Sequence, residues 1–555
     1  MDTEKAPRRM RFPSLKKILK DAVKILAATL VLLLFVEGAI RVVYAIRNAR
    51  VEVVPIPYMV RNFGLVAPWM DSLRILEPDD ELMWKGRPHV HRKYMDVFSP
   101  ARTQDERVAL LSRFNPGIPD WLRGNHVWEF SLNSDGFRDE DFPAVKAPNT
   151  LRILCLGDSW TFGANVNQDE SYPSRLRAML KKDFPAARIE VFNLGMLAYT
   201  SYQGLELLKR RALALQPDIV IIGYAMNDAS ISGWRDKDLA QAGAPRFKLK
   251  KFFAAHMESY KLAAYLAQVS RFDQISMSEH LKAMNDPARR LETYEGWESA
   301  EFLEAADYAQ LEAKTRVSPQ DYEKNVRAMV ALIREHQASP ILLHNEIRPG
   351  SPYQAALRKL SIEERVPLVD STDIIAQAKQ QLAQQLTERL GLQQSGVAAK
   401  RSDNTSTVRG VEVVFRLYAG EQLVQRALYI TGPHKELGDA VPNRIAMYDD
   451  GTHGDERAGD RVWTYTARFA PGQKIFYVYT NSGSEGLWEG LDVPKIRSFN
   501  VPDKEGARVY KPLESFGEIY MQADGWHTTA AGLDRIARAI KETVEQHETF
   551  RARIK

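Results

Sequence analysis

A serine, a histidine and an aspartate in this sequence have the neighbours needed for nucleophilic attack on a carbonyl. Ser159 follows an apolar run that ends in Gly157-Asp158, and Asp524 precedes His527 by three residues. A serine hydroxyl becomes a nucleophile when an imidazole takes its proton, and that imidazole needs an acceptor that fixes its tautomer. We therefore predict a triad with Ser159 as nucleophile, His527 as base and Asp524 as the residue that orients the base.

Donors for the oxyanion of a tetrahedral intermediate are expected close to this triad. The side-chain amide of Asn227, just after the apolar run PDIVIIGY, is one candidate, and the backbone amide of Ser159 is a second. A third donor is expected from the loop that follows the run IEVFNLG. Trp160 and Asp228, which adjoin these groups, are predicted to contact the substrate, and Asp228 also to brace the Asn227 loop.

Each of these residues also has a structural interpretation. Alone, the tripeptide ending at Ser159 is equally typical of a turn in which Asp158 caps the next helix. The presence of Asn227 and of the Asp524/His527 pair favours catalysis. His344, at the end of a strand-like run, is more typical of a structural or pocket-lining imidazole. Arg138 has two interpretations, an anion contact or a buried salt bridge, and the salt bridge is favoured.

Short apolar runs predict the strands that position these side chains. Runs of this length rich in Val, Ile and Leu suit strands covered on both faces, which indicates a parallel sheet flanked by helices. Sites in such α/β folds lie at the carboxyl ends of the strands. Residues 527–548 are predicted to form a closing amphipathic helix. The runs are LRILCLG (151–157), IEVFNLG (189–195), PDIVIIGY (217–224), PILLHNE (340–346) and VPLVD (366–370).

Two insertions interrupt this α/β pattern. Residues 231–338 are charged and helix-prone and predict a helical cap or side layer, whereas residues 405–503 alternate β-formers with turn residues and predict a β-sandwich. The α/β core is accordingly assigned to residues 151–404 and 504–555. Residues 50–150, rich in Pro and Trp, are predicted to be a connecting and packing segment.

The N-terminal region has the pattern of a membrane signal. Residues 1–24 carry a cluster of Lys and Arg, and an apolar stretch over 25–40 is broken only by Glu37, which lies one turn from Arg41 and can pair with it. Basic residues before a first apolar segment stay in the cytoplasm. We predict a single anchor over 25–44 in the inner or plasma membrane, with the rest of the chain periplasmic or otherwise extracytoplasmic. A cleaved signal peptide is the alternative.

Composition excludes several other classes of protein. The net charge is +5 and no folded segment combines a basic stripe with aromatic residues, so a nucleic-acid partner is not expected. The single cysteine, Cys155, excludes disulfides within the chain and CxxC metal sites, and is expected to be a small buried hydrophobe. The predicted chemistry requires no metal and no organic cofactor.

Four motifs together resemble the blocks of the SGNH (GDSL-like) hydrolases. They are GDSW at 157–160, NLG at 193–195, the pair Asn227-Asp228 and Asp524-x-x-His527, in the family's order. The stretch 132–143 is similar to the lead-in of exported, membrane-anchored members. The resemblance covers residues 132–230, 338–375 and 515–548, and it implies a flavodoxin-like sheet and a serine esterase that works through an acyl-enzyme.

One position departs from the pattern of that family. Ala198 stands where the second block usually has the glycine whose amide binds the oxyanion. An alanine amide still donates if its φ is negative, but its methyl group would lie beside the acyl pocket. Gly195 is the alternative donor if the loop has a different register.

The β-rich insertion is similar to immunoglobulin-like, starch-binding carbohydrate-binding modules. This likeness implies glycan contact through exposed aromatics such as Trp488 and Tyr448, although a spacer whose aromatics are core residues fits the pattern equally. Within it, four aspartates cluster among glycines without the spacing of an EF-hand, so calcium binding and tight turns both stay open. They are Asp449, Asp450, Asp455 and Asp460.

These features predict an exported serine esterase that removes O-acetyl-sized groups from a cell-envelope or exported polysaccharide. The first alternative is a polysaccharide O-acetyltransferase that uses the same triad and receives its acyl donor from a membrane partner. The second is a noncatalytic glycan-binding scaffold, which would bind glycan and turn over no ester.

Overall fold

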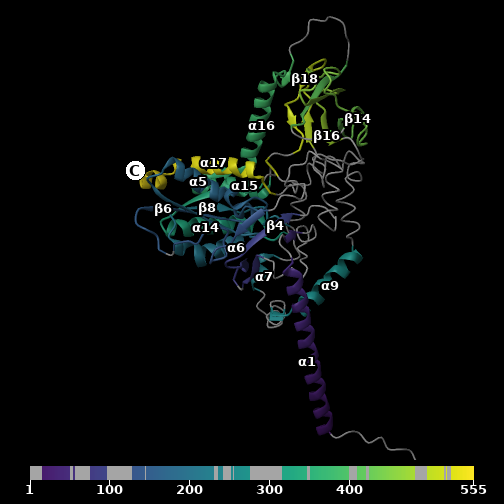
Figure 1. Ribbon diagram of the computed structural model, residues 1–555. Helices are drawn as coiled ribbons and strands as arrows, with labels where there is room; N and C mark the ends of the chain where they lie inside the picture. The colour runs from purple at the N-terminus through teal and green to yellow at the C-terminus, as the bar shows by residue number, and fades with distance from the viewer. Residues whose placement is uncertain are drawn as a thin grey trace, which may run out of the picture. The chain divides into compact units, whose positions relative to one another are not determined.

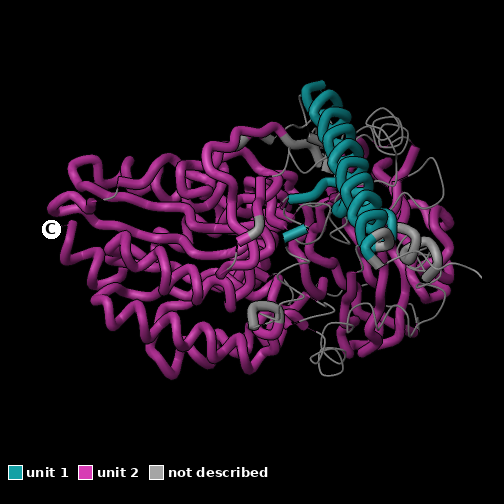
Figure 2. The backbone as a smooth tube through the Cα atoms, turned by 90° about the horizontal axis from the view of Figure 1, so that it is seen from below, with its two compact units in different colours: residues 1–52, 64–74, 243–272 teal, residues 53–63, 75–242, 273–555 magenta. Residues whose placement is uncertain are grey.

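The computed structural model describes most of the chain, in two compact units. One unit comprises residues 1–52, 64–74 and 243–272, and the other residues 53–63, 75–242 and 273–555 (Figure 2). The residues described are 15–50, 54–56, 75–79, 81–96, 128–143, 145–230, 235–241, 252–253, 256–275, 315–346, 351–398, 409–420, 424, 426–481, 497–517, 520–521 and 527–554.

The first unit contains a long apolar helix, α1 (Leu15–Asn48). Its segment Leu19–Asn48 contains an 18-residue window with a mean hydropathy of 2.2 and is long and apolar enough to cross a membrane, a criterion that a signal sequence also meets. The predicted pair is present, because Arg41 Nε donates to Glu37 Oε1 over 2.8 Å. Glu37 also accepts hydrogen bonds from the backbone amides of Glu258 and Ser259, which open helix α9 (Glu258–Ile275). The one acid in the apolar stretch is therefore fully engaged.

A five-stranded parallel sheet is the centre of the second unit (Figure 1). Its strand order is β10-β9-β8-β6-β7. In this doubly wound order, β7 is added on one side of β6 and the later strands on the other side, so the switch point lies at β6. Each of the five predicted runs contains or overlaps one strand, which confirms the predicted α/β fold with a parallel sheet. The strands are β6 (Thr150–Gly157), β7 (Arg188–Gly195), β8 (Ile219–Gly223), β9 (Ser339–His344) and β10 (Leu368–Asp370).

Helices cover both faces of this sheet because its strands are apolar on both sides. Leu154 and Leu156 of β6 pack with α6, α14 and α15, whereas Ile153 and Cys155 pack with α5 and α17. The predicted closing helix is α17, whose buried residues recur at helical spacing. The helices are α5 (Tyr172–Asp183), α6 (Ser201–Leu207), α14 (Pro319–Glu335), α15 (Pro352–Glu364), α16 (Ser371–Leu390), α17 (Ala530–Gln546) and α18 (Glu548–Ile554).

The predicted helical insertion extends too far toward the C-terminus. Helix α14 falls inside 231–338, yet it buries Tyr322, Val326 and Met329 against the sheet and is part of the core. Its charged outer face concealed this role in the sequence. Within 231–314 the described residues include α7 (Asp236–Gln241) and α9.

The segment predicted as a β-sandwich contains two sheets that share one hydrophobic cluster, including Phe415, Ile430 and Tyr477. Strands from outside the predicted boundaries 405–503 belong to one of these sheets, because β11 pairs with β18 and β18 pairs with β12. One sheet holds β11 (Gly396–Val397), β12 (Val411–Tyr418), β15 (Val462–Phe469), β18 (Arg508–Tyr510) and β19 (Glu514–Ser515). The other holds β13 (Leu428–Thr431), β14 (Ile445–Ala446), β16 (Lys474–Asn481) and β17 (Arg497–Asn500).

The described part of the predicted packing segment contacts the loop after β7. Trp84, in a hairpin of β2 (Leu76–Asp79) and β3 (Met83–Gly86), donates from Nε1 to the carbonyl of Leu197 over 3.0 Å. Gln203 Nε2 donates to the Leu82 carbonyl over 2.9 Å. A second sheet upstream consists of β1 (Val54–Ile56), β4 (His91–Asp96) and β5 (Trp128–Ser131).

Gly195, the last residue of β7, lies against the backbone that follows the neighbouring strand β6. A Cβ at this position would lie 2.2 Å from the backbone nitrogen of Phe162, which is backbone and cannot turn aside. Gly195→Ala should therefore destabilise the protein by about 1–3 kcal/mol, which calorimetry would register as a lower thermal midpoint. Gly223→Ala is the control, since its Cβ would meet the flexible Leu343 Cδ2 at 3.2 Å. Equal midpoints for the two variants would contradict this packing.

Candidate active site

Ser159 lies at the carboxyl end of the central strand β6. Asp158 accepts a hydrogen bond from the amide of Trp160 over 3.0 Å and so caps the short helix α4 (Ser159–Phe162), of which Ser159 is the first residue. The helix ends at Gly163, which has a left-handed φ of 84°. The strand-to-helix turn thus presents the serine hydroxyl at the sheet edge where α/β proteins place their sites.

The imidazole of His527 contacts this hydroxyl. His527 Nε2 lies 2.9 Å from Ser159 Oγ, although the two residues are 368 positions apart. The histidine lies three positions before Ala530, the first residue of α17. The start of this helix is fixed because the side chain of Thr529 accepts a hydrogen bond from the amide of Gly532. Asp524, the predicted third member of the triad, lies outside the residues that the structure describes.

Asp158 links the nucleophile turn to Asn227. Asn227 Nδ2 donates to Asp158 Oδ2 over 3.2 Å, and the side chain of Asn345 also hydrogen-bonds to Asp158. Burial raises the pKa of Asp158 to about 7, against the lowering effect of these hydrogen bonds. The aspartate therefore serves as a helix cap, as in the structural interpretation, and also orients the predicted oxyanion donor. Asn345 was missed because it has no characteristic spacing from the other site residues.

In the predicted oxyanion loop after β7, Ala198 does not have the negative φ under which an alanine amide would donate without strain. The structure gives a left-handed φ of +60°, the conformation for which glycine is usual. Such a φ is strained by about 1–2 kcal/mol for a residue with a side chain. The alternative donor is already engaged, because the Gly195 amide donates to Asn193 Oδ1 over 2.9 Å. Ala198 N–H donates to no group in the described part of the chain.

Trp160 and Asp228 were predicted to contact the substrate, but both side chains are buried. Trp160 is only 2% exposed and belongs to the core cluster between the sheet and α17, because its indole is largely apolar. Asp228 is fully buried and accepts hydrogen bonds from both the amide and the hydroxyl of Ser201. The expected bracing role of Asp228 agrees with these contacts.

Arg138 is buried and contacts the backbone at the end of α4. Its fully buried guanidinium donates to the carbonyls of Phe162, Gly163 and Val166, just past the end of α4. Burial lowers the pKa of Arg138 to about 9. The orphan carbonyls at the end of the nucleophile helix thereby gain a donor.

His344 has the structural position expected for it. It is buried, and its Nδ1 lies 3.2 Å from Asp370 Oδ1 at the ends of β9 and β10. Burial lowers the pKa of His344, but the hydrogen bonds and charges of Asp370 and Glu346 outweigh that effect and raise it overall.

Three of the four clustered aspartates come together in the β-rich part. One carboxylate oxygen from each of Asp449, Asp455 and Asp460 lies within 4.8 Å of the others. Burial raises the pKa of all three, and repulsion from neighbouring acidic side chains adds to this effect. Asp455 and Asp460 also accept backbone hydrogen bonds, as tight turns require. The ring of Tyr448 stacks on His453 at 3.9 Å between centroids, and Trp488 lies outside the described residues.

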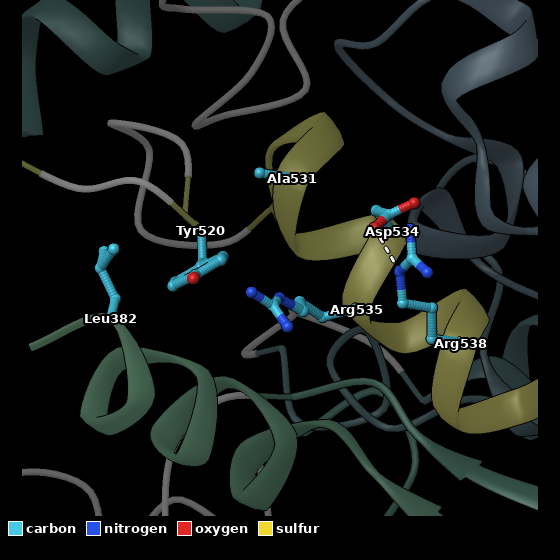
Figure 3. Close-up of a pocket in the computed structure, with 6 residues that line it drawn as sticks. All are labelled: Leu382, Tyr520, Ala531, Asp534, Arg535 and Arg538. Atoms are coloured by element: carbon cyan, nitrogen blue, oxygen red, sulfur yellow. Dashed lines mark hydrogen bonds and ion pairs between the residues drawn. The ribbon is translucent and has the colours of Figure 1, made fainter. Parts of the chain in front are cut away.

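A cavity of about 440 Å³ lies between α16 and α17, close in sequence to His527 (Figure 3). Arg535 points toward the ring of Tyr520, with its guanidinium carbon 6.0 Å from the ring centroid, while Asp534 pairs with Arg538. None of the predicted site residues that the structure describes lines this cavity. Its lining residues are Leu382, Tyr520, Ala531, Asp534, Arg535 and Arg538.

Asp228 provides a pH test of the loop it braces. Burial raises its pKa to about 8, above the value of about 4 for an unfolded aspartate. The native state then holds a proton that the unfolded state has lost, so stability falls as pH rises from 4 through 8. The thermal midpoint of wild type relative to Asp228→Asn should fall over this range.

Asp321→Asn is the opposite-sign control for that experiment. Although partial burial raises the pKa of Asp321, its hydrogen bond and ion pair with Lys237 lower it overall. Its stabilising contribution is therefore lost on acidification rather than on alkalinisation. A wild-type midpoint that rose relative to Asp228→Asn between pH 4 and 8 would contradict a protonated, buried Asp228.

Part of the chain is similar in sequence to known proteins. Residues 155–399 match the model of the GDSL-like Lipase/Acylhydrolase family. An acetylxylan esterase from Xylanibacter ruminicola is 29% identical over 103 residues, which cover 17% of this chain and 20% of the relative. The chain therefore spans about a fifth of the length of that curated relative.

Solved structures of similar proteins include two esterase-type enzymes. A catalytic mutant of an acetylxylan esterase from Geobacillus stearothermophilus is 14% identical over 42% of this chain and 80% of its own, with a TM-score of 0.23. A GDSL-like lipase from Bacteroides thetaiotaomicron is 11% identical over 42% and 74%, with a TM-score of 0.21. Residues 155–399 are therefore similar to the GDSL-like lipases and acylhydrolases.

Proposed function

We propose that this chain is a membrane-anchored serine esterase that removes acetyl-sized groups from a polysaccharide outside the cytoplasm. The observation that carries the proposal is the 2.9 Å contact between His527 Nε2 and Ser159 Oγ. An imidazole in hydrogen-bond contact with a serine at the end of a central parallel strand is the arrangement that activates a nucleophile.

The proposed reaction proceeds through an acyl-enzyme. Ser159 Oγ attacks the ester carbonyl while His527 Nε2 takes its proton, and the carbonyl oxygen becomes an oxyanion. The amides of Ser159 and Ala198 and the side chain of Asn227 bind that oxyanion. The intermediate then collapses and its bond to the sugar oxygen breaks, and this oxygen takes the proton from His527 to become a hydroxyl. Water activated by the same imidazole releases acetate and restores the serine.

Asp524 completes the proposed triad by accepting a hydrogen bond from Nδ1 of His527. This role rests on its spacing, because Asp524 lies three positions before His527 in the sequence. A carboxylate in that place fixes the tautomer that leaves Nε2 free to accept the serine proton, and stabilises the imidazolium that forms.

Three features support an exported acetylated glycan as the substrate. The curated relative that matches is an acetylxylan esterase. Helix α1 is apolar enough to span a membrane and follows a basic N-terminus, so we infer that the N-terminus is cytoplasmic and the site extracytoplasmic. The β-rich part, which we infer to be a module resembling carbohydrate-binding modules, would hold the glycan near the site.

Acetate release tests this proposal. The purified full chain in detergent should hydrolyse p-nitrophenyl acetate and release free acetate from acetylated xylan without any acyl donor. Ser159→Ala and His527→Gln should each lower kcat by on the order of 10⁴-fold. Ser174→Ala is the control, because Ser174 lies in helix α5 and is not among the proposed site residues. This variant should retain full activity.

The alternatives give different products in the same assay. Acetylation of a deacetylated glycan from an added donor, without release of acetate, would indicate the O-acetyltransferase. Glycan binding that Ser159→Ala leaves unchanged, with no ester hydrolysed by wild type, would indicate the noncatalytic scaffold and refute the esterase.

A further inference from the structure

Two side chains from distant parts of the sequence hold the strained turn at Ala198. The carbonyl of Leu197 accepts a hydrogen bond from Trp84 Nε1 over 3.0 Å, and the carbonyl of Ala198 accepts one from Arg316 Nη1 over 2.8 Å. Trp84 comes from the upstream hairpin, and Arg316 precedes α14. Each of the two consecutive peptide groups around Ala198 is therefore anchored through its oxygen.

The guanidinium of Arg316 is itself held rigidly. It pairs with both oxygens of the fully buried Asp236, from Nε over 3.1 Å and from Nη2 over 2.9 Å. Nη2 also donates to Gln203 Oε1 over 3.2 Å, and the guanidinium carbon lies 5.5 Å from the centroid of the Trp84 ring. A two-pronged pair of this kind fixes the plane of the arginine as well as its position.

The turn lies directly beside the nucleophile. In the sheet Gly195 is the register partner of Gly157, and the amide of Met196 donates to the carbonyl of Gly157 over 3.0 Å. The Ala198 residue follows two positions later and is exposed. An amide from this turn is thus available at the edge where Ser159 and His527 meet.

Peptide geometry connects these anchors to the oxyanion. A trans peptide is planar, and its C=O and N–H point in opposite directions. Trp84 fixes the Leu197 carbonyl, so it also fixes the direction of the Ala198 N–H in the same peptide group. Arg316 fixes the next peptide group, and together the two constrain both backbone dihedrals of Ala198. A glycine would adopt this conformation readily, whereas alanine tends to leave it.

We propose that Trp84 and Arg316 are positioning residues that hold the left-handed Ala198 turn so that its amide binds the oxyanion. Their hydrogen bonds keep position 198 in the left-handed conformation, which a glycine would adopt without such support. This inference rests on the proposed esterase function and adds to it the residues that make an alanine workable in the oxyanion loop.

The test combines Trp84→Phe with Ala198→Gly in the full chain, with p-nitrophenyl acetate as the probe. Trp84→Phe removes the indole donor and keeps an aromatic ring. It should lower kcat about 10-fold, because without this hydrogen bond only about a tenth of the molecules would keep Ala198 in the left-handed conformation. The KM should change less than about 2-fold. In the Ala198→Gly background the same change should lower kcat no more than about 3-fold, because glycine keeps the turn unaided.

Two controls separate positioning from general destabilisation. Trp463→Phe, in strand β15, should leave kcat unchanged in both backgrounds. If Trp84→Phe lowers the thermal midpoint enough to deplete the folded enzyme, Arg316→Lys decides the question by the same criterion. It keeps a positive charge beside Asp236 but loses the fork geometry.

The outcomes distinguish the two levels of the proposal. A wild-type enzyme that hydrolyses the ester, with equal losses in the alanine and glycine backgrounds or with none, would overturn the positioning role and leave the esterase standing. A wild-type enzyme that hydrolyses no ester would overturn the esterase, and the positioning role with it.

Discussion

One contact determines how this protein must fold to act: the imidazole of His527 has to meet the hydroxyl of Ser159, and 368 positions separate them. The parallel sheet solves half of this problem by placing Ser159 at the carboxyl edge of β6, beside the reversal point of the strand order. Helix α17 solves the other half, because its apolar face packs on the same sheet and its first turn follows His527. The insertions between Ser159 and His527 are compatible with this contact, because the chain before and after each insertion belongs to the same core.

Around that contact, the site is held largely by bonds to backbone carbonyls. Arg138 holds the end of α4, and Trp84 and Arg316 hold the turn at Ala198 that we propose binds the oxyanion. Asp158 instead joins side chains, since it accepts from Asn227 while it caps the helix that begins with Ser159. Strained or exposed catalytic groups depend on such support, because their own conformations are not the ones their residue types favour.

The sequence predicted those parts whose signals are local. The five strands and α17 were found because burial leaves a periodic pattern. Ser159 and His527, which the structure places in contact, were selected because their neighbours are specific. What it missed has a common physical reason: an arginine or tryptophan that donates to a distant carbonyl leaves no spacing to detect, so Trp84 and Arg316 were counted with packing and insertion segments. The left-handed φ of Ala198 was missed because its residue type argues against it. Helix α14 was assigned to the insertion because its exposed face is charged.

The structure of a covalent phosphonate adduct with Ser159 is the most direct test of the central claim, that His527 and the oxyanion donors converge on this serine. The account predicts phosphorus bonded to Ser159 Oγ, with the phosphoryl oxygen about 2.7–3.1 Å from the Ala198 nitrogen and Asn227 Nδ2. His527 Nε2 should stay within hydrogen-bond distance of the serine oxygen. An unmodified Ser159, or an adduct whose phosphoryl oxygen contacts neither donor while the imidazole turns away, would contradict the account.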